Sequence, residues 1–257
     1  MVTTRNAQEA AEHANRRTIV ISDAHGYPAF IENALAHACF DPVIDRLVFA
    51  GDFIDRGPDS ERCLELIEEH ADIILFGNHE VELMIGAPIE FDSGSDQFES
   101  LLIERFREDQ QRWRIAVAVG DVLVTHAGLC TEYLRALGRT SVASAEELAL
   151  AVEAQARFEL GVILGIGVAD YDGVLSQTGP LWFRPHHRFL AELPAGLVQM
   201  VGHTPPETTE GDLTRHCWHL VDPFAFRSPP MQGSCRYGII DSAGPRVVSF
   251  IDVGTES

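Results

Sequence analysis

The chain has 257 residues and a formal net charge of −20, from 39 acidic and 19 basic residues, and every basic residue is an arginine. Such a negative field disfavours nonspecific binding to nucleic acid or to an anionic membrane surface, so we expect neither as a partner. A polyanionic ligand would need a local arginine pocket. The 46% hydrophobic and 23% charged content is ordinary for a globular protein.

The chain start and the cysteines bear on the compartment. Residues 1–17 carry charges and lack the apolar core of a secretory signal. The longest uncharged apolar stretch, residues 160–169, is shorter than the roughly 20 residues that a membrane helix needs. Five cysteines without a CxxC pair argue against a disulfide framework. We therefore expect a soluble, cytoplasmic protein with reduced thiols.

Three strand–loop–helix units are predicted in the first third of the chain. Residues 18–23 form an apolar, β-branched run, and helical spacing follows Gly26. The same order recurs over 46–70 and again from 72, where a helix starts near His79. Buried strands that alternate with helices predict an α/β fold with a largely parallel sheet.

The remainder of the chain is richer in strands. An amphipathic helix is predicted at 98–113, a hairpin over 113–127 with its turn at Gly120–Asp121, and a further helix, from its composition, at 144–160. No linker-like run interrupts the chain, so we expect one compact domain. Four further short strands are predicted within 197–204, 216–222, 235–241 and 246–253.

Side chains that can bind metal stand at the C-terminal ends of the predicted strands. Ligands bind outside these ends in open α/β sheets, so side chains far apart in sequence can converge there. Carboxylate, amide and imidazole groups together suit Mn, Fe or Zn, and the absence of thiolates argues against a structural zinc site. The candidate ligands are Asp23, His25, Asp52, Asn78, His126 and His203.

Four further residues fit phosphoryl transfer at a two-metal site. Arg56 and Arg184 can offset the charge on phosphate oxygens through forked hydrogen bonds. His79, next to Asn78, can protonate a leaving alkoxide as a general acid, and Asp55 can orient its ring and keep it cationic. Two metal ions can hold a hydroxide between them for in-line attack on phosphorus.

The sequence contains five motifs in the order SDAHG, GDFIDRG, GNHE, HAGL and GHT. In this order and spacing they resemble the phosphoprotein phosphatase family of calcineurin-like metallophosphoesterases. VGHTP and GPLWFR are similar to its bacterial and Shewanella-like branches, and the resemblance runs from about residue 18 to about residue 250. Ser22 stands where the family usually has Gly, and GHT replaces the GHQ of eukaryotic members.

The resemblance implies a fold and a role for each residue. The fold is a β-sandwich flanked by helices, in αββα layers. Residues 18–257 would form a single metallophosphoesterase domain with a helical insertion at about 131–180, after a disordered or loosely packed tail at 1–17. The first metal would be held by Asp23, His25 and Asp52, and the second by Asp52 as a bridge with Asn78, His126 and His203. His79 with Asp55 would be the proton donor, and Arg56 and Arg184 would bind phosphate.

The resulting hypothesis is a dinuclear metal-dependent phosphatase, with Mn the first metal and Fe or Zn alternatives. Its substrate would be a phosphomonoester, first of all phosphoserine or phosphothreonine in proteins, attacked by a hydroxide that bridges the metals. The alternative is a symmetric dinucleoside polyphosphate hydrolase, which would want further cations such as Arg188 and Arg215, or a small-molecule phosphatase. A non-catalytic phosphate-binding module would be expected to have lost a ligand or the His79–Asp55 pair, and none is lost.

Overall fold

The computed structural model describes residues 16–84, 96–139, 141, 144–163, 176–185, 193–205, 213, 218–223 and 234–251. Its strands are β1 (Arg17–Ile21), β2 (Asp45–Ala50), β3 (Ile73–Leu75), β4 (Trp113–Arg114), β5 (Ala116–Val119), β6 (Val122–Thr125), β7 (Val198–Val201), β8 (Trp218–Leu220), β9 (Ser234–Asp241) and β10 (Gly244–Ile251). Its helices are α2 (Pro28–His37), α3 (Ser60–His70), α4 (Asn78–Met84), α5 (Asp96–Glu108), α6 (Thr131–Ala136) and α7 (Ala145–Ile163).

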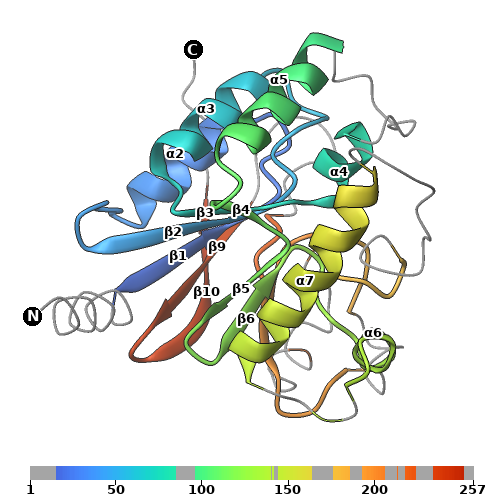
Figure 1. The fold of residues 1–257 in the computed structure, drawn as a ribbon. Helices are drawn as coiled ribbons and strands as arrows, with labels where there is room; N and C mark the ends of the chain where they lie inside the picture. Colours follow the sequence, from blue (N-terminus) through green and yellow to red (C-terminus); the bar gives the residue numbers. More distant parts are fainter. Residues whose placement is uncertain are drawn as a thin grey trace, which may run out of the picture.

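The strands form two sheets that lie between helices. One sheet has the order β10-β9-β1-β2-β3-β4 and the other the order β5-β6-β7-β8. In Figure 1, α2, α3 and α5 lie over the first sheet, and α7 runs along the second. The predicted α/β fold, with two sheets flanked by helices, is confirmed.

The three predicted strand–helix units build the parallel part of the first sheet. Strand β2 pairs in parallel with both β1 and β3, and β4 extends the sheet in the same direction. Strands β9 and β10 join the other edge in antiparallel orientation, so that Thr18 of β1 pairs with Ile240 of β9. The whole sheet is therefore mixed, with its parallel half where the sequence predicts it.

Alternation along the strands divides the core into layers. In β2, Leu47 and Phe49 belong to the core under the helices, whereas Val48 and Ala50 belong to the core between the two sheets. Successive strand side chains point to opposite faces, so a strand covered on both faces is apolar throughout. Met200 of β7, fully buried, fills the inter-sheet layer from the opposite side.

The predicted hairpin is confirmed, but its first strand is divided. Strand β4 pairs with β3 in the first sheet, while β5 pairs with β6 in the second, and Ile115 lies between them. Glu153 of α7 accepts hydrogen bonds from the backbone N–H groups of Ile115 (2.5 Å) and Ala116 (2.9 Å). The apolar pattern runs through both strands without a break, so it does not reveal this change of sheet.

The structure describes the start of the predicted domain and parts of the expected insertion. Strand β1 begins at Arg17, and the Arg16 guanidinium donates to the carbonyls of Pro42 (2.7 Å) and Val43 (2.6 Å). Residues 1–15 of the expected tail, and residues 140, 142–143 and 164–175 of the expected insertion, lie outside the described residues. The single-domain organisation stays a prediction. Among the described helices, none has the length and apolar character to cross a membrane.

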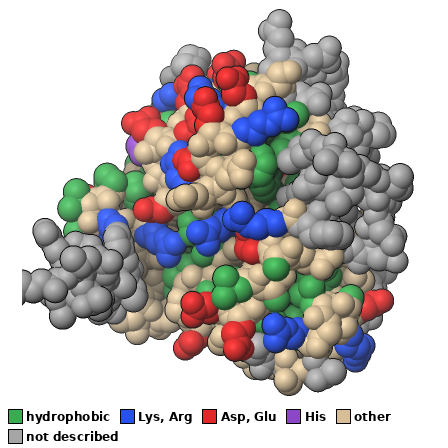
Figure 2. Space-filling view, in the orientation of Figure 1, with side chains coloured by type: hydrophobic (Ala, Val, Ile, Leu, Met, Phe, Trp, Pro, Cys, Tyr) green, Lys and Arg blue, Asp and Glu red, His purple; other side chains and the backbone are tan. Residues whose placement is uncertain are grey.

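Charge is unevenly distributed over the face of the molecule shown in Figure 2. Acidic side chains gather over α2 and α3, and arginines form a band across the middle of this face. Burial lowers the pKa of Arg46 most, Asp72 opposes this shift, and the neighbouring cations Arg114 and Arg16 lower the pKa further. The net negative field is therefore interrupted locally.

The inter-sheet layer can be tested by cavity formation. We expect Met200→Ala to lower the free energy of unfolding by about 2–5 kcal/mol, because the methionine is fully buried between the sheets. Val43→Ala, at a side chain with 80% exposure, is the matched control and should stay within about 0.5 kcal/mol of wild type. Denaturant unfolding measures both. Equal stabilities of Met200→Ala and wild type would contradict the packing described.

Candidate metal centre

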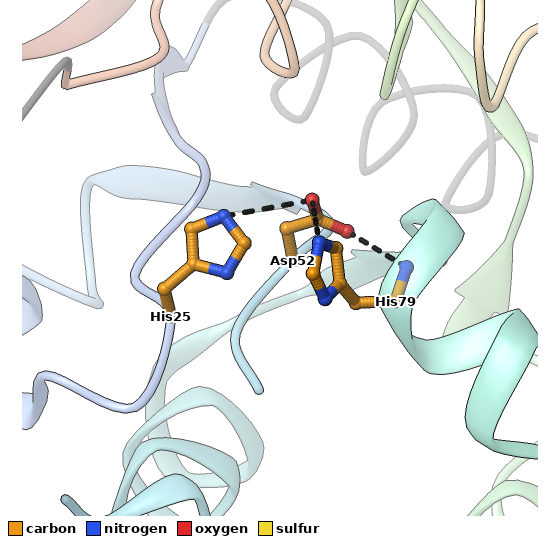
Figure 3. Close-up of side chains that lie close together, drawn as sticks. All are labelled: His25, Asp52 and His79. Carbon is orange, nitrogen blue, oxygen red and sulfur yellow. Dashed lines mark hydrogen bonds and ion pairs between the residues drawn. The ribbon is translucent and has the colours of Figure 1, made fainter. Parts of the chain in front are cut away.

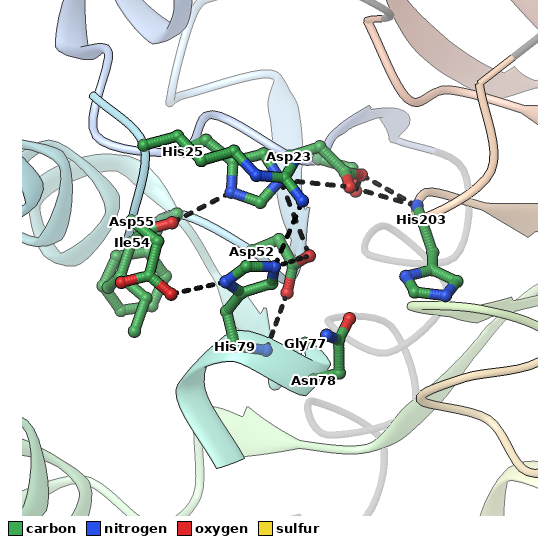
Figure 4. A network of polar contacts seen from close by, with 12 residues as sticks. Asp23, His25, Asp52, Ile54, Asp55, Gly77, Asn78, His79 and His203 are labelled. Atoms are coloured by element: carbon green, nitrogen blue, oxygen red, sulfur yellow. Dashed lines mark hydrogen bonds and ion pairs between the residues drawn. The ribbon is translucent and has the colours of Figure 1, made fainter. Parts of the chain in front are cut away.

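The structure brings the six predicted metal ligands together at the ends of five strands. Asp23 and His25 follow β1, Asp52 follows β2, and Asn78 begins α4 just after β3. His126 follows β6 and His203 follows β7, so two of the ligands come from the second sheet. All six side chains are buried. Figure 4 shows the labelled ligands converging on the space around Asp52.

Backbone strain is concentrated in these loops. Seven non-glycine residues of the described chain have positive φ, and one of them, Cys39, lies elsewhere. Left-handed backbone disfavours L-residues and tends to persist where function requires it. The other six are all predicted site residues, namely Asp23, His25, Asp52, Asp55, Arg56 and His203.

Two glycines allow the loops after β2 and β3 to touch. A Cβ on Gly51, whose φ is +86°, would lie 2.5 Å from the backbone N of Gly77. A Cβ on Gly77 would lie 2.0 Å from Oδ1 of Asp52. Any larger residue would push the Asp52 loop away from the Asn78 loop.

The first cluster contains His25, Asp52 and Asp23. The Nε2 atom of His25 lies 3.7 Å from Oδ2 of Asp52 and 3.9 Å from Oδ1 of Asp23. Its Nδ1 lies 2.9 Å from the Ile54 carbonyl, to which it donates, and burial lowers the pKa of His25 to about 3. The ring is therefore neutral, with the Nε2 lone pair directed at the cluster, as a metal ligand requires. Figure 3 shows His25 and His79 on either side of Asp52.

The second cluster gathers around Nε2 of His126. The Nδ1 atom of this ring donates to the Ala50 carbonyl at 2.8 Å. Its Nε2 lies 3.1 Å from Oδ1 of Asn78, 3.2 Å from Nδ1 of His203 and 3.4 Å from Oδ2 of Asp52. The three atoms around Nε2 can each direct a lone pair at it, so the position suits a cation, either the proton on Nε2 or a metal ion in its place.

Electrostatics also favours positive charge at this position. Burial works against protonation, yet Asp52 raises the pKa of His126 to about 9. Burial and Asp222 raise the pKa of Asp23 well above its ordinary value, because the carboxylates repel one another. A divalent ion would compete with the proton for Nε2 and relieve the repulsion. The residues present therefore fit a metal pair that shares Asp52.

His79 differs from the ligand histidines. Its Nδ1 contacts the Asp55 carboxylate at very short range, and its Nε2 lies 3.8 Å from Oδ2 of Asp52. Burial opposes protonation, but Asp52 and Asp55 together raise the pKa of His79 to about 9. The pKa of His126 is raised as far, but its Nδ1 donates to a backbone carbonyl, whereas Nδ1 of His79 contacts a second carboxylate that suits the ring to proton donation. The predicted pairing of His79 with Asp55 is present in the structure.

The two arginines are exposed, unlike the ligands. The Arg56 guanidinium lies 2.8 Å from Nε2 of His25 and 3.4 Å from Nε2 of His79. Arg184 donates to the carbonyl of His203. Both cations thus stand at the open side of the buried cluster. Because Arg56 contacts the lone pair of His25, it must move aside when a metal ion binds there.

Three buried polar residues beside the ligands, Ser22, Asp222 and Glu80, were given no functional role by the sequence. The Ser22 hydroxyl contacts a carboxylate oxygen of Asp23 and lies 3.1 Å from the Ala50 carbonyl, so the departure from Gly adds a polar contact to a ligand. Asp222 follows β8 and is 7% exposed. Glu80 is fully buried, and burial and Asp52 raise its pKa to about 7 against the backbone N–H donors of Asp52 and Gly77. The GNHE motif was the signal that could have found Glu80.

The family can now be stated. Residues 16–228 match the family model Metallophos, described as calcineurin-like phosphoesterase. The chain belongs to the calcineurin-like phosphoesterase family. Metallophosphoesterases of this family are hydrolases, and the strand-end clusters lie where the sequence motifs of the resemblance place them.

Curated relatives in this family carry two different names. A serine/threonine-protein phosphatase 1 from Salmonella typhimurium is 45% identical over 65 residues, which are 25% of this chain and 30% of the relative. A symmetrical bis(5′-nucleosyl)-tetraphosphatase from Chromohalobacter salexigens is 32% identical over 154 residues, 55% of this chain and 53% of the relative. The chain thus spans between about a third and about half of these relatives.

Solved phosphoesterase structures share the fold. A cold-active protein tyrosine phosphatase superposes with a TM-score of 0.61 at 15% identity, over 92% of this chain and 76% of the other. A serine/threonine phosphatase from Saccharomyces cerevisiae gives 0.60 at 14% identity, over 95% and 82%. At these identities the likeness is one of fold alone.

The His79–Asp55 pair can be tested in metal-free protein. We expect His79 to titrate at about pH 9, and Asp55→Asn to lower its pKa by about one pH unit or more, because a negative charge is lost beside the ring. NMR titration of the ring measures both values. Asp59→Asn, an exposed change close by in the same loop, should leave the titration unchanged. An unaltered His79 pKa in Asp55→Asn would rule out the pairing.

Proposed function

We propose that this phosphoesterase is a dinuclear metal-dependent phosphatase that hydrolyses phosphomonoesters, with phosphoserine or phosphothreonine in proteins as the first substrate. The observation that supports it most is the His79–Asp55 pair next to two groups of buried ligands that share Asp52, with His25 and Asp23 in one group and His126 and His203 in the other. Two divalent ions, Mn first and Fe or Zn as alternatives, would be held by Asp23, His25, Asp52, Asn78, His126 and His203. When bound, they lower the pKa of water and polarise phosphoryl oxygens.

The chain's own residues supply the remaining chemistry. The guanidinium groups of Arg56 and Arg184, at the exposed side, can bind the phosphoryl oxygens through charge-assisted hydrogen bonds. His79 can give the proton on its Nε2 to the leaving oxygen, while Asp55 holds Nδ1 and fixes the ring. Attack of water from the opposite side leaves no covalent bond between enzyme and phosphate.

The proton donor favours one substrate class over the other. A serine or threonine alkoxide is a strong base and leaves only when it is protonated, so cleavage of its ester needs an acid such as His79. A nucleoside phosphate is a far weaker base and leaves without that help. This contrast supports the phosphomonoester as the first substrate.

The second candidate is symmetric cleavage of a dinucleoside polyphosphate. It is favoured by the relatives with that name, which match a larger part of this chain than the serine/threonine phosphatase does. Such a substrate carries several phosphates and would need cations beyond Arg56 and Arg184 to bind them. The predicted additional cations, Arg188 and Arg215, lie outside the described residues. A cytoplasmic location, and the exclusion of nucleic acid and membranes as partners, remain proposals that rest on charge and composition.

The general acid can be tested with two leaving groups. With Mn²⁺ and a phosphoserine peptide, we expect His79→Asn to lower kcat by about 10²- to 10⁴-fold. With an aryl phosphate, whose phenolate leaves more readily, the loss should be much smaller. His70→Asn, a histidine on α3, is the matched control and should behave as wild type. Equal losses on both substrates would show that His79 does not protonate the leaving group.

The substrate class can be tested by direct competition of two compounds. With Mn²⁺, we expect a larger kcat/KM for a phosphoserine peptide than for diadenosine tetraphosphate. Asp52→Asn should abolish both activities, because both clusters lose their shared carboxylate. A preference for the tetraphosphate, with ADP as the product, would favour the second candidate. Folded, metal-loaded protein that cleaves neither of these nor an aryl phosphate would exclude the proposed function.

A further inference from the structure

Glu80 joins two of the three loops that carry the first sheet's metal ligands, the loop of Asp52 and the loop of Asn78. Its Oε2 accepts from the backbone N–H groups of Asp52 (2.9 Å) and Gly77 (2.7 Å). Its Oε1 accepts from those of Phe53 (2.9 Å) and Ile54 (3.3 Å). Each oxygen therefore receives two N–H groups, and the side chain has no exposure to solvent.

Helix capping accounts for only one of these four bonds. Gly77 immediately precedes α4 and Glu80 is the third residue of that helix, so the bond from Gly77 N–H to Glu80 is the returning half of a capping box. The other three N–H groups belong to the loop after β2, a different segment of the chain. Helix stability alone gives no reason for a carboxylate to reach that loop.

The N–H groups that Glu80 contacts belong to the ligand Asp52 and to residues adjacent to site residues in the chain. Asp52 is the carboxylate shared by both clusters; its backbone is left-handed (φ 59°), and its N–H donates to Glu80. Buried N–H groups without a partner are costly, so this strained loop needs an acceptor at that place. In return, the backbone N–H of His79 donates to Oδ1 of Asp52 at 3.2 Å. The two loops are thus tied in both directions.

We infer that Glu80 is a positioning residue for the metal centre: its carboxylate fixes the Asp52 loop against the Asn78 loop, and so sets the spacing of their ligands. This inference rests on the proposed function, since ligand spacing matters only if the site binds metal. Outer groups that orient metal ligands typically change metal affinity by about 10- to 100-fold when removed. Glu80 would act in this way through the backbone.

The test replaces one oxygen of Glu80 by an amide. In Glu80→Gln, the NH2 group must face two N–H donors, so two of the four hydrogen bonds are lost. We expect Mn²⁺ affinity, measured by isothermal titration calorimetry on metal-free protein, to fall by about 10- to 100-fold. Glu80→Asp keeps both oxygens and the charge but has a shorter reach, and should fall between Glu80→Gln and wild type.

Glu153→Gln is the matched control, because Glu153 also accepts two backbone N–H groups, at Ile115 and Ala116, away from the ligand loops. Both Gln variants should lower the melting temperature of the metal-free protein, and only Glu80→Gln should weaken Mn²⁺ binding. Unchanged Mn²⁺ affinity in folded Glu80→Gln, or an equal loss in Glu153→Gln, would overturn the inference. If Glu80→Gln does not fold, wild-type affinity in folded Glu80→Asp overturns it.

The two proposals fail in different ways. Wild-type protein that binds Mn²⁺ but hydrolyses no phosphoester removes the proposed function and leaves the effect of Glu80 on Mn²⁺ affinity intact. Active wild-type protein with an unaffected Glu80→Gln removes only the role of Glu80. Wild-type protein that binds none of Mn²⁺, Fe²⁺ and Zn²⁺ overturns both.

Discussion

The buried charge of Asp52 is the interaction on which the rest of the site depends. A carboxylate with almost no exposure is strongly destabilising unless positive charge surrounds it. His126 and His79 supply that charge and lower the pKa of Asp52 well below its ordinary value, although burial alone would raise it. In turn, Asp52 holds protons on both rings. Where a metal ion takes the place of one of these protons, the same carboxylate becomes its ligand.

This arrangement separates three histidines by environment. His25 is neutral because burial outweighs the attraction of Asp52, and His203 is neutral because burial and the nearby His126 lower its pKa well below the ordinary value. His79 is cationic because two carboxylates face it. The pKa of His126 is also raised to about 9, so charge alone does not divide ligand from acid. His79 is set apart because its Nδ1 contacts a second carboxylate, Asp55, whereas Nδ1 of His126 donates to the Ala50 carbonyl. Similar side chains can serve different steps of one reaction in this way.

The position of the site could be predicted from the sequence. Each ligand lies at the C-terminal end of an apolar run, and such a run can be recognised as a strand from its residues alone. The division of the hairpin strand at Ile115 could not be predicted, since nothing in the apolar pattern marks a change of sheet. The pairing of Thr18 with Ile240 was likewise hidden, as it joins residues at opposite ends of the chain. The role of Glu80 could not be predicted from residue types, because its partners are backbone N–H groups, which every residue except proline has.

The division of the ligands between the two sheets has a consequence for stability. Asp23, His25, Asp52 and Asn78 are attached to the first sheet, whereas His126 and His203 are attached to the second. An ion held by both groups would join the sheets much as a disulfide joins two segments of chain. Separation of the sheets would then require release of the ion, so metal concentration would act directly on the unfolding equilibrium. The same coordination that prepares a phosphoester for hydrolysis would thus also hold the sandwich closed.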